Sequence, residues 1–153
     1  MIFPITFILT LFLTQIARAV GHDPFFRRLL LILVHVQATF KATYNPIYDS
    51  ADETLNDVAC SQLFATYMMF GMVPLFPFIG GAPNTTYNSP NCGAIWKVTN
   101  PENGAAIYFT GIDYSSGFDL SLETFVVIGG STEKGSVEVE AEIVGRLTKG
   151  LTS

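Results

Sequence analysis

The chain has 153 residues, and its 13 Asp and Glu residues outnumber its 8 Lys and Arg residues, which gives a formal net charge of −5 at neutral pH. Proteins bind the phosphates of nucleic acids through clustered Lys and Arg, so this balance argues against a nucleic-acid partner. The length suits a single domain, and no internal repeat, low-complexity run or linker indicates a second one.

The N-terminal segment has the pattern of a secretory leader. Residues 1–19 (MIFPITFILTLFLTQIARA) are apolar, are interrupted by Thr, and end in the A-x-A pattern of a signal-peptidase site. The charged FFRR and the apolar LLLILVHV then repeat this pattern up to Ala38, as in a tandem or incorrectly spliced leader. We expect a leader at 1–38 and secretion of residues 39–153, because a retained apolar tail would promote aggregation. Cleavage after Ala19, or an uncleaved leader as the only membrane contact, are the alternatives.

The mature domain is more acidic than the whole chain, because residues 39–153 hold five Lys and Arg against twelve Asp and Glu. Its first expected element is a short strand over 41–45 (KATYN). A short helix through Leu55 and Val58 should follow, since Ser50 and Glu53 have the spacing of a capping box.

Cys60 and Cys92 are the only cysteines, and two cysteines allow one disulfide, two free thiols or a weak metal site. A metal is the poorest account, because neither Cys has a partner at ligand spacing and the only histidines, His22 and His35, lie in the leader. Secretion favours a disulfide, which would contribute roughly 3–4 kcal/mol by constraining the unfolded chain. Two buried free thiols are the alternative. We expect no metal and no cofactor.

Residues 62–91 are dense in Pro and Gly, which forbids long regular elements and indicates a turn-rich excursion. Within it, Asn84 begins the sequon NTT, which predicts N-glycosylation in a secreted protein. The Asn88 string NSP is not a sequon, because Pro stands at the third position, where the pattern requires Ser or Thr.

The second half of the domain is richer in regular elements. We expect strands over 94–99 (AIWKVT), 105–113 (AAIYFTGID) and 136–144 (SVEVEAEIV), with a short helix or strand over 120–128 (LSLETFVVI). Trp96 should lie in the core.

The last strand alternates strictly between apolar and acidic residues. One face would carry Val137, Val139, Ala141 and Ile143, and a solvated face Glu138, Glu140 and Glu142. Several short strands between turn signals predict a mainly β fold with short helices, arranged as a small barrel or sandwich.

The order of several motifs resembles the cerato-platanin family of small secreted fungal proteins. The matching strings, from about Ala42 to about Val144, are ATYNPIYD, LNDVACS, FPFIGGAP, YNSPNCG, TGID and GFDLSLETF. The resemblance implies a double-ψ β-barrel related to that of expansins and secretion to the fungal wall and medium. It also implies binding of chitin-type N-acetylglucosamine oligomers or wall polysaccharide, and action on plants as an elicitor or phytotoxin.

The chain departs from the family pattern in two places. Ile95 stands where the family has a Cys, and the C-terminal Cys is absent from GRLTKG, so both partners of one family disulfide are missing. The resemblance therefore implies that Cys60 and Cys92 form the other disulfide. After Ser61 the chain continues directly to QLFATY, so a surface loop of the family is shortened.

Five residues are candidates for carbohydrate binding. Asp113, in TGID at a strand end, matches an acidic groove residue of related double-ψ barrels, and its carboxylate can accept hydrogen bonds from sugar hydroxyls. The family's N-terminal motif adds Tyr48 and Asp49, and Ser89 and Asn91 are expected to line the same groove. Each residue also has a structural alternative. Asp113 could form a turn, the Tyr48 hydroxyl could be satisfied in the core, and Asp49 could lie at a helix start. Ser89 and Asn91 could simply form a turn.

We expect no catalytic residues. Glycoside hydrolysis needs two carboxylates at a set separation, and Asp113 lacks an evident partner because Asp57 and Asp119 are expected in helix-start or turn contexts. The expected function is non-hydrolytic binding. The alternatives are an expansin-like loosening of cell walls or weak polysaccharide modification, centred on Asp113, and a structural wall protein recognised by a plant receptor.

Overall fold

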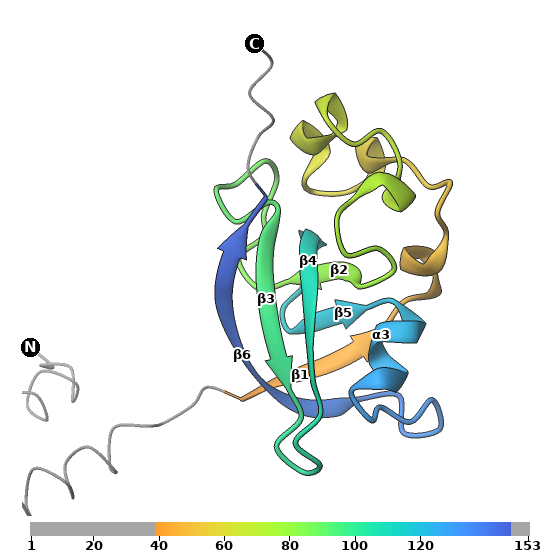
Figure 1. The fold of residues 1–153 in the computed structure, drawn as a ribbon, viewed down its shortest axis with the longest axis vertical. Coiled ribbons are helices and arrows are strands. Elements are labelled where there is room, and N and C mark those ends of the chain that lie inside the picture. The colour runs from red at the N-terminus through yellow and green to blue at the C-terminus, as the bar shows by residue number, and fades with distance from the viewer. Residues whose placement is uncertain (1–38, 148–153) are drawn as a thin grey trace, which may run out of the picture. The chain divides into compact units, whose positions relative to one another are not determined.

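The computed structural model describes residues 39–147, which form a closed six-stranded barrel with short helices (Figure 1). Around the barrel the strands neighbour one another in the order β1, β5, β2, β4, β3, β6. The strands are β1 (Thr39–Tyr44), β2 (Ile79–Ala82), β3 (Ala94–Thr99), β4 (Ala106–Tyr114), β5 (Phe118–Leu120) and β6 (Val137–Arg146). The helices are the 3-10 helices η1 (Pro46–Asp49), η2 (Leu55–Asp57), η3 (Ser61–Ala65) and η4 (Phe70–Met72), and the α-helix α3 (Leu122–Val127). The predicted mainly β fold with short helices is confirmed.

Two of the six strand pairings are parallel, β1 with β5 and β2 with β4, and the other four are antiparallel. The leader predicted at 1–38 lies outside the described residues. Between residues 39 and 147, none of the helices has the length and apolar character needed to cross a bilayer.

The strands predicted around 41–45, 94–99, 105–113 and 136–144 are present as β1, β3, β4 and β6. The segment 120–128, expected to be a short helix or a strand, contains parts of both. β5 ends at Leu120, and α3 begins after Ser121, whose Oγ accepts a hydrogen bond from the backbone N–H of Thr124 at 3.2 Å.

The helix predicted after Ser50 is wrong in extent. The backbone N–H of Leu55 donates to the carbonyl of Met68 at 3.3 Å, and that of Phe70 donates to the carbonyl of Glu53 at 2.8 Å. This pairing with a distant segment holds Thr54 extended, so only the single turn η2 forms, capped by the Thr54 hydroxyl. A tertiary contact overrides the local capping signal.

The domain has two apolar cores. The first fills the barrel around Phe118, whose ring contacts those of Phe40, Trp96 and Phe109 edge-to-face. Trp96 is 7% exposed, so the prediction that it lies in the core is confirmed.

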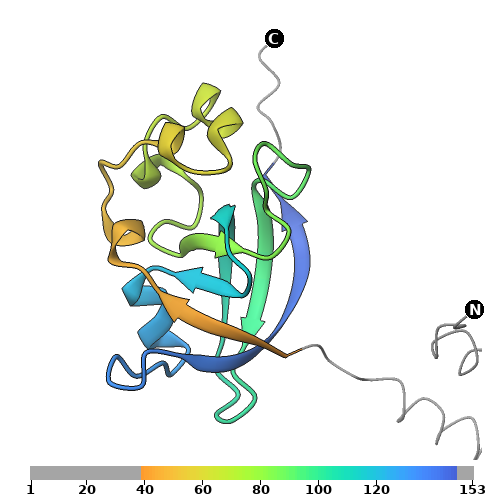
Figure 2. The ribbon, with the colours of Figure 1, turned by 180° about the vertical axis from the view of Figure 1, so that it is seen from behind.

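The second core lies between the outer face of β2 and β4 and the segment 45–78, which carries η1 to η4 and which we call the helical lobe. Its buried residues are Tyr48, Leu55, Cys60, Leu63, Phe70, Val73, Ile79 and Ile112. In Figure 1 the 3-10 helices η2, η3 and η4 (yellow to green) lie together at one end of the barrel, whereas η1 (orange) lies beside α3, and Figure 2 shows the same arrangement from behind.

The predicted disulfide is confirmed and ties this lobe to the loop before β3. Cys60 and Cys92 are bonded, with their Cα atoms 5.3 Å apart. The backbone N–H of Cys60 also donates to the carbonyl of Ile112 in β4 at 3.1 Å.

The acidic side of β6 is solvated as predicted for Glu138 and Glu142, and Val139 on the other face is buried. Ile143 departs from the pattern and is 42% exposed. It lies beside a register shift against β3 that leaves Val144 without a partner, so the alternation ends there.

Candidate functional site

Asp113 lies near the end of β4, directly after a β-bulge. Gly80 pairs with Gly111 and Gly81 with Asp113, so Ile112 is an extra residue in β4. One extra residue moves the rest of a strand to the opposite face. Ile112 and Asp113 therefore both face the helical lobe, and the carboxylate of Asp113 stays out of the barrel interior.

The carboxylate of Asp113 joins the helical lobe to the barrel. Its Oδ1 accepts hydrogen bonds from the backbone N–H groups of Ala59 at 2.9 Å and Tyr114 at 2.8 Å. Its Oδ2 accepts from the Tyr48 hydroxyl at 3.1 Å. A carboxylate offers about four lone-pair sites, so these three bonds leave about one, on Oδ2, for a ligand.

Tyr48 is buried, and its role is to position Asp113. Burial raises the pKa of the Tyr48 phenol, and the neighbouring Asp113 carboxylate raises it further. The hydroxyl therefore remains a protonated donor at neutral pH.

Asp119 is a second carboxylate on the same outer face, and its expected place in a turn is wrong. It lies in β5 and pairs with Gly81, which pairs on its other side with Asp113. Partners in register point to one face, and two strand spacings place the two Asp Cα atoms about 10 Å apart. Thr43 pairs with Asp119 from β1, and its hydroxyl donates to Asp119 Oδ1 at 3.0 Å. We call Thr43, Asp119, Gly81 and Asp113 the carboxylate row.

The middle of the carboxylate row has little free space. A side chain added at Gly81 would approach Cβ of Ser115 to 3.1 Å. The turn between β4 and β5 thus covers the backbone between the two carboxylates, which leaves them accessible on either side of Ser115.

Asp49, the second member of the YD motif, caps α3. Its Oδ2 accepts from the backbone N–H of Leu122 at 2.7 Å and its Oδ1 from that of Glu123 at 3.1 Å. Both oxygens complete the first turn of a helix 73 residues further along the chain, which is the structural alternative that the sequence left open.

Ser89 and Asn91 lie in a different place from Asp113. Ser89 lines a surface depression of about 350 Å³ beside the disulfide, together with Gln62 and Arg146. Asn91 Oδ1 accepts a hydrogen bond from the guanidinium of Arg146 at 3.1 Å. Asp113 does not line this depression, so the five predicted residues do not form one groove.

The described residues contain no group of three or more His, Cys, Asp or Glu side chains arranged to hold a metal ion. At the carboxylate row, the groups available to a ligand are the carboxylates of Asp113 and Asp119 and the hydroxyl of Thr43, which form hydrogen bonds.

Fold and site together define a small β-barrel of mixed strand direction with a polar outer face next to a disulfide-bonded lobe. The sequence model of the family described as Cerato-platanin matches residues 40–148. The chain belongs to the cerato-platanin family.

Individual relatives agree with this assignment. The chain is 43% identical over 102 residues to cerato-platanin of Ceratocystis fimbriata f. sp. platani, covering 63% of this chain and 75% of the relative. The solution structure of the fungal elicitor cerato-platanin superposes with a TM-score of 0.62 at 41% identity, covering 68% of this chain and 91% of that one.

A more distant structure shows the wider fold. A variant of Clavibacter michiganensis expansin in complex with cellohexaose matches with a TM-score of 0.51 at 19% identity, covering 73% of this chain and 53% of that one. At this identity the likeness concerns the fold alone. It confirms the prediction of a double-ψ barrel related to that of expansins.

Proposed function

We propose that this protein is secreted, binds chitin-type N-acetylglucosamine oligomers or related cell-wall polysaccharide without cleaving them, and acts on plants as an elicitor or phytotoxin. The observation that carries the proposal is the carboxylate row, which places Asp113 and Asp119 on one outer face of the barrel.

The row offers acceptors suited to sugar hydroxyls. The remaining lone pair of Asp113 Oδ2 and the free oxygen of Asp119 can each accept a hydroxyl hydrogen bond. Tyr114, next to Asp113, is 57% exposed and supplies an aromatic ring at the same strand end. The sugar carries no net charge and each hydrogen bond contributes modestly, so affinity should rise with oligomer length and depend little on salt.

The geometry also supports binding without hydrolysis. Hydrolysis needs one carboxyl group to exchange a proton with the leaving oxygen while a second acts as base or nucleophile. Asp113 is engaged by three donors from Ala59, Tyr114 and Tyr48, and Ser115 covers the space between it and Asp119. Ser115 thus leaves little room for a glycosidic bond close to the backbone between the two carboxylates.

Secretion is supported by the leader pattern of residues 1–38 and by the disulfide, which persists in an oxidising compartment. Asn84 is exposed in its loop, as a glycan acceptor must be. A solved relative is described as a fungal elicitor, which supports the same role towards plants here.

The test is a titration of the secreted protein with chitotetraose, followed by NMR shifts, with product analysis after long incubation. We expect saturable shifts at the amides of Gly81, Asp113 and Tyr114, and no shorter oligomers. Asp119→Asn should weaken binding about tenfold, by analogy with the loss of one charge-assisted hydrogen bond. Glu138→Gln, on the exposed side of β6, is the matched control. An absence of saturable shifts would remove the binding proposal, and shorter products would make the protein a hydrolase.

The presence of a second carboxylate in the row favours one other function, expansin-like loosening of cell walls. This function would be supported if the wild type extended a polysaccharide strip under load without releasing reducing sugar, and if Asp119→Asn did not extend the strip. Recognition by a plant receptor without polysaccharide binding is the remaining alternative, and an elicitor response that survives in Asp119→Asn would favour it.

A further inference from the structure

The helical lobe exposes an apolar surface that neither the barrel nor the carboxylate row uses. Within residues 68–75, Met68 is 52% exposed, Met69 45%, Met72 48% and Leu75 40%, and we call these four the methionine patch. The backbone N–H of Met72 donates to the carbonyl of Met69 at 3.0 Å, which keeps Met69 and Met72 in one turn. Single exposed apolar side chains are ordinary, but a group of this kind marks an interaction surface.

Leu75 adds a second observation. Its φ angle is 74°, in the left-handed region that a bulky residue rarely adopts and that costs free energy. That cost is not offset by full burial of the side chain, because Leu75 remains 40% exposed. A partner that covers Leu75 would supply the missing burial.

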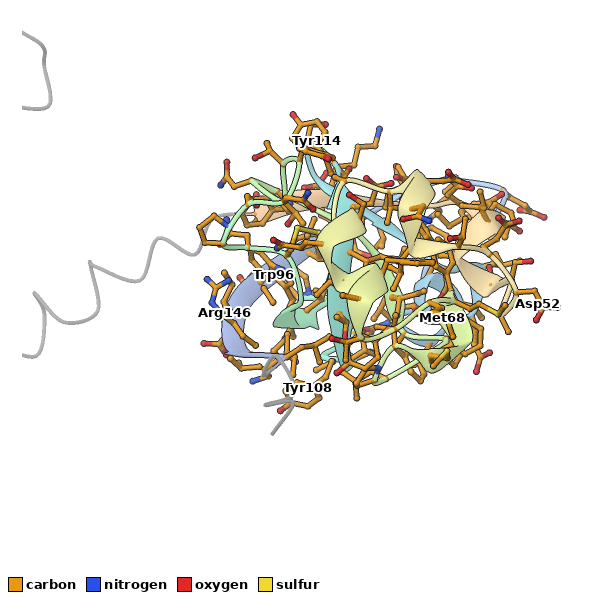
Figure 3. All side chains as sticks on the ribbon, turned by 90° about the horizontal axis from the view of Figure 1, so that it is seen from above. Asp52, Met68, Trp96, Tyr108, Tyr114 and Arg146 are labelled. Carbon is orange, nitrogen blue, oxygen red and sulfur yellow. A yellow bond between two sulfur atoms is a disulfide. The ribbon has the colours of Figure 1, made fainter. Side chains whose placement is uncertain are left out.

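The surroundings of the methionine patch are acidic. Residues 42–96 contain no Lys, Arg or His, and their four acidic residues are Asp49, Asp52, Glu53 and Asp57. The backbone of 51–55 pairs with that of 68–71, which places Asp52 and Glu53 along the border of the patch, and Asp57 follows at the end of η2. Figure 3 shows Asp52 and Met68 towards one end of the domain and Arg146 at the other.

No described cation neutralises this border. The ion pair found among residues 39–147 joins Lys97 to Glu142 at 3.6 Å, between β3 and β6. Asp52 and Asp57 are exposed, and Glu53 is partly exposed.

We propose that the methionine patch and its acidic border bind a cationic amphipathic helix of a partner peptide or protein. Met side chains are flexible and polarisable, so they adapt to the Leu or Phe stripe of such a helix. Asp52, Glu53 and Asp57 then face the flanking Lys or Arg residues, which gives orientation and a fast association rate.

The same charges disfavour the other occupants of an apolar surface. A second copy bound through a two-fold axis would bring two acidic borders together. A bilayer with anionic headgroups would be repelled by the border for the same reason.

Fluorescence anisotropy with a labelled synthetic helix of Leu and Lys, roughly 18 residues or five turns long, tests the proposal on the full secreted protein. The same peptide with Glu in place of Lys is its control. We expect the Lys peptide to bind at least about tenfold more tightly than the Glu peptide, and added salt to weaken it. The double variant Met68→Ser with Met72→Ser, and separately Asp52→Asn with Asp57→Asn, should each weaken binding about tenfold. Tyr108→Ser, a similarly exposed side chain on β4, should bind as the wild type does.

Equal binding of the Lys and Glu peptides, or unchanged binding by the methionine variant, would overturn the proposal. Sedimentation would overturn it in favour of a second copy if it showed a dimer that the methionine variant abolishes. Flotation with phosphatidylserine vesicles would overturn it in favour of a membrane if the wild type bound them without the peptide and the methionine variant did not. The chitotetraose titration reports on the carboxylate row and should be unaffected by either lobe variant.

Discussion

The barrel and the helical lobe are held by different kinds of interaction. The barrel combines backbone ladders between all six strands with an apolar core around Phe118. The lobe has no sheet, and its 3-10 helices are short with weaker hydrogen-bond geometry. Besides its own apolar core, the lobe relies on the Cys60 disulfide and on the carboxylates of Asp113 and Asp49. Barrel stability is therefore spread over many contacts, whereas the stability of the lobe depends on a few side chains.

Removing the centre of the barrel core should have the largest effect. Phe118→Ala would lose ring contacts at centroid distances of 5.3 Å to Phe40 and Trp96 and 5.6 Å to Phe109. We expect a loss of about 3–5 kcal/mol, measured by urea unfolding with the fluorescence of Trp96, the only Trp in the chain. Tyr108→Ala, exposed on β4, should change stability by less than about 0.5 kcal/mol. A similar small loss for Phe118→Ala would mean that the barrel does not depend on this core.

Removing the disulfide should be the next largest change and should act on the lobe. Cys60→Ser and Cys92→Ser should each cost roughly 3–4 kcal/mol, because the bond restricts the unfolded chain over a separation of 32 residues. Thermal unfolding measures this, and amide exchange should accelerate in 45–78 before it does in β3 and β4. The disulfide account is wrong if the wild type melts at the same temperature with and without reductant.

The Asp49 cap tests the link between the lobe and α3 at a smaller scale. Asp49→Ala leaves the backbone N–H groups of Leu122 and Glu123 without this acceptor and should cost about 1–2 kcal/mol. Chemical unfolding gives the magnitude, and amide exchange should rise at Leu122 and Glu123. Asp52→Ala, an exposed neighbour in sequence, is the control. If both variants lose equally little, the cap does not contribute to stability.

The smallest expected effect is that of the Tyr48 hydroxyl. Tyr48→Phe removes one donor to Asp113 and should cost about 1 kcal/mol at neutral pH. Because burial raises the folded-state pKa of Tyr48, its contribution is fully present below the ordinary value of about 10 and is lost as the pH rises above it. The melting temperatures of wild type and variant should therefore converge at alkaline pH, while exposed Tyr108→Phe should follow the wild type. A constant difference up to about pH 11 would contradict this assignment.

The barrel was largely predictable from the sequence, because apolar and polar residues alternate in strands such as SVEVEAEIV, and this alternation indicates which side chains face the core. The exception is β2, whose IGGA has two Gly residues and is buried throughout, so it shows no period of two. The lobe was not predictable in the same way. Its extended segment near Glu53 depends on Phe70, a partner that local patterns do not reveal.

The candidate site was predicted in part. Asp113 and Tyr48 are adjacent, whereas Asp49 caps a distant helix and Ser89 lies in a separate depression. Asp119 was missed as a partner of Asp113, because β5 has only three residues and follows a turn. The alternation of Phe118, Asp119 and Leu120 was the one local signal, but only the shared pairing with Gly81 relates Asp119 to Asp113.

The bulge at Ile112 has a consequence for how the length of the chain can change during evolution. Deleting one codon between Phe109 and Asp113 would close the bulge and keep the carboxylate on the outer face, because the two residues would then be an odd number of positions apart in a regularly alternating strand. Deleting two codons would turn the carboxylate towards the apolar interior. Gains or losses of residues in β4 are thus subject to a parity rule. The helical lobe, which has no ladder with the barrel, is free of that rule, and the loop that we predict to be shortened after Ser61 lies in this lobe.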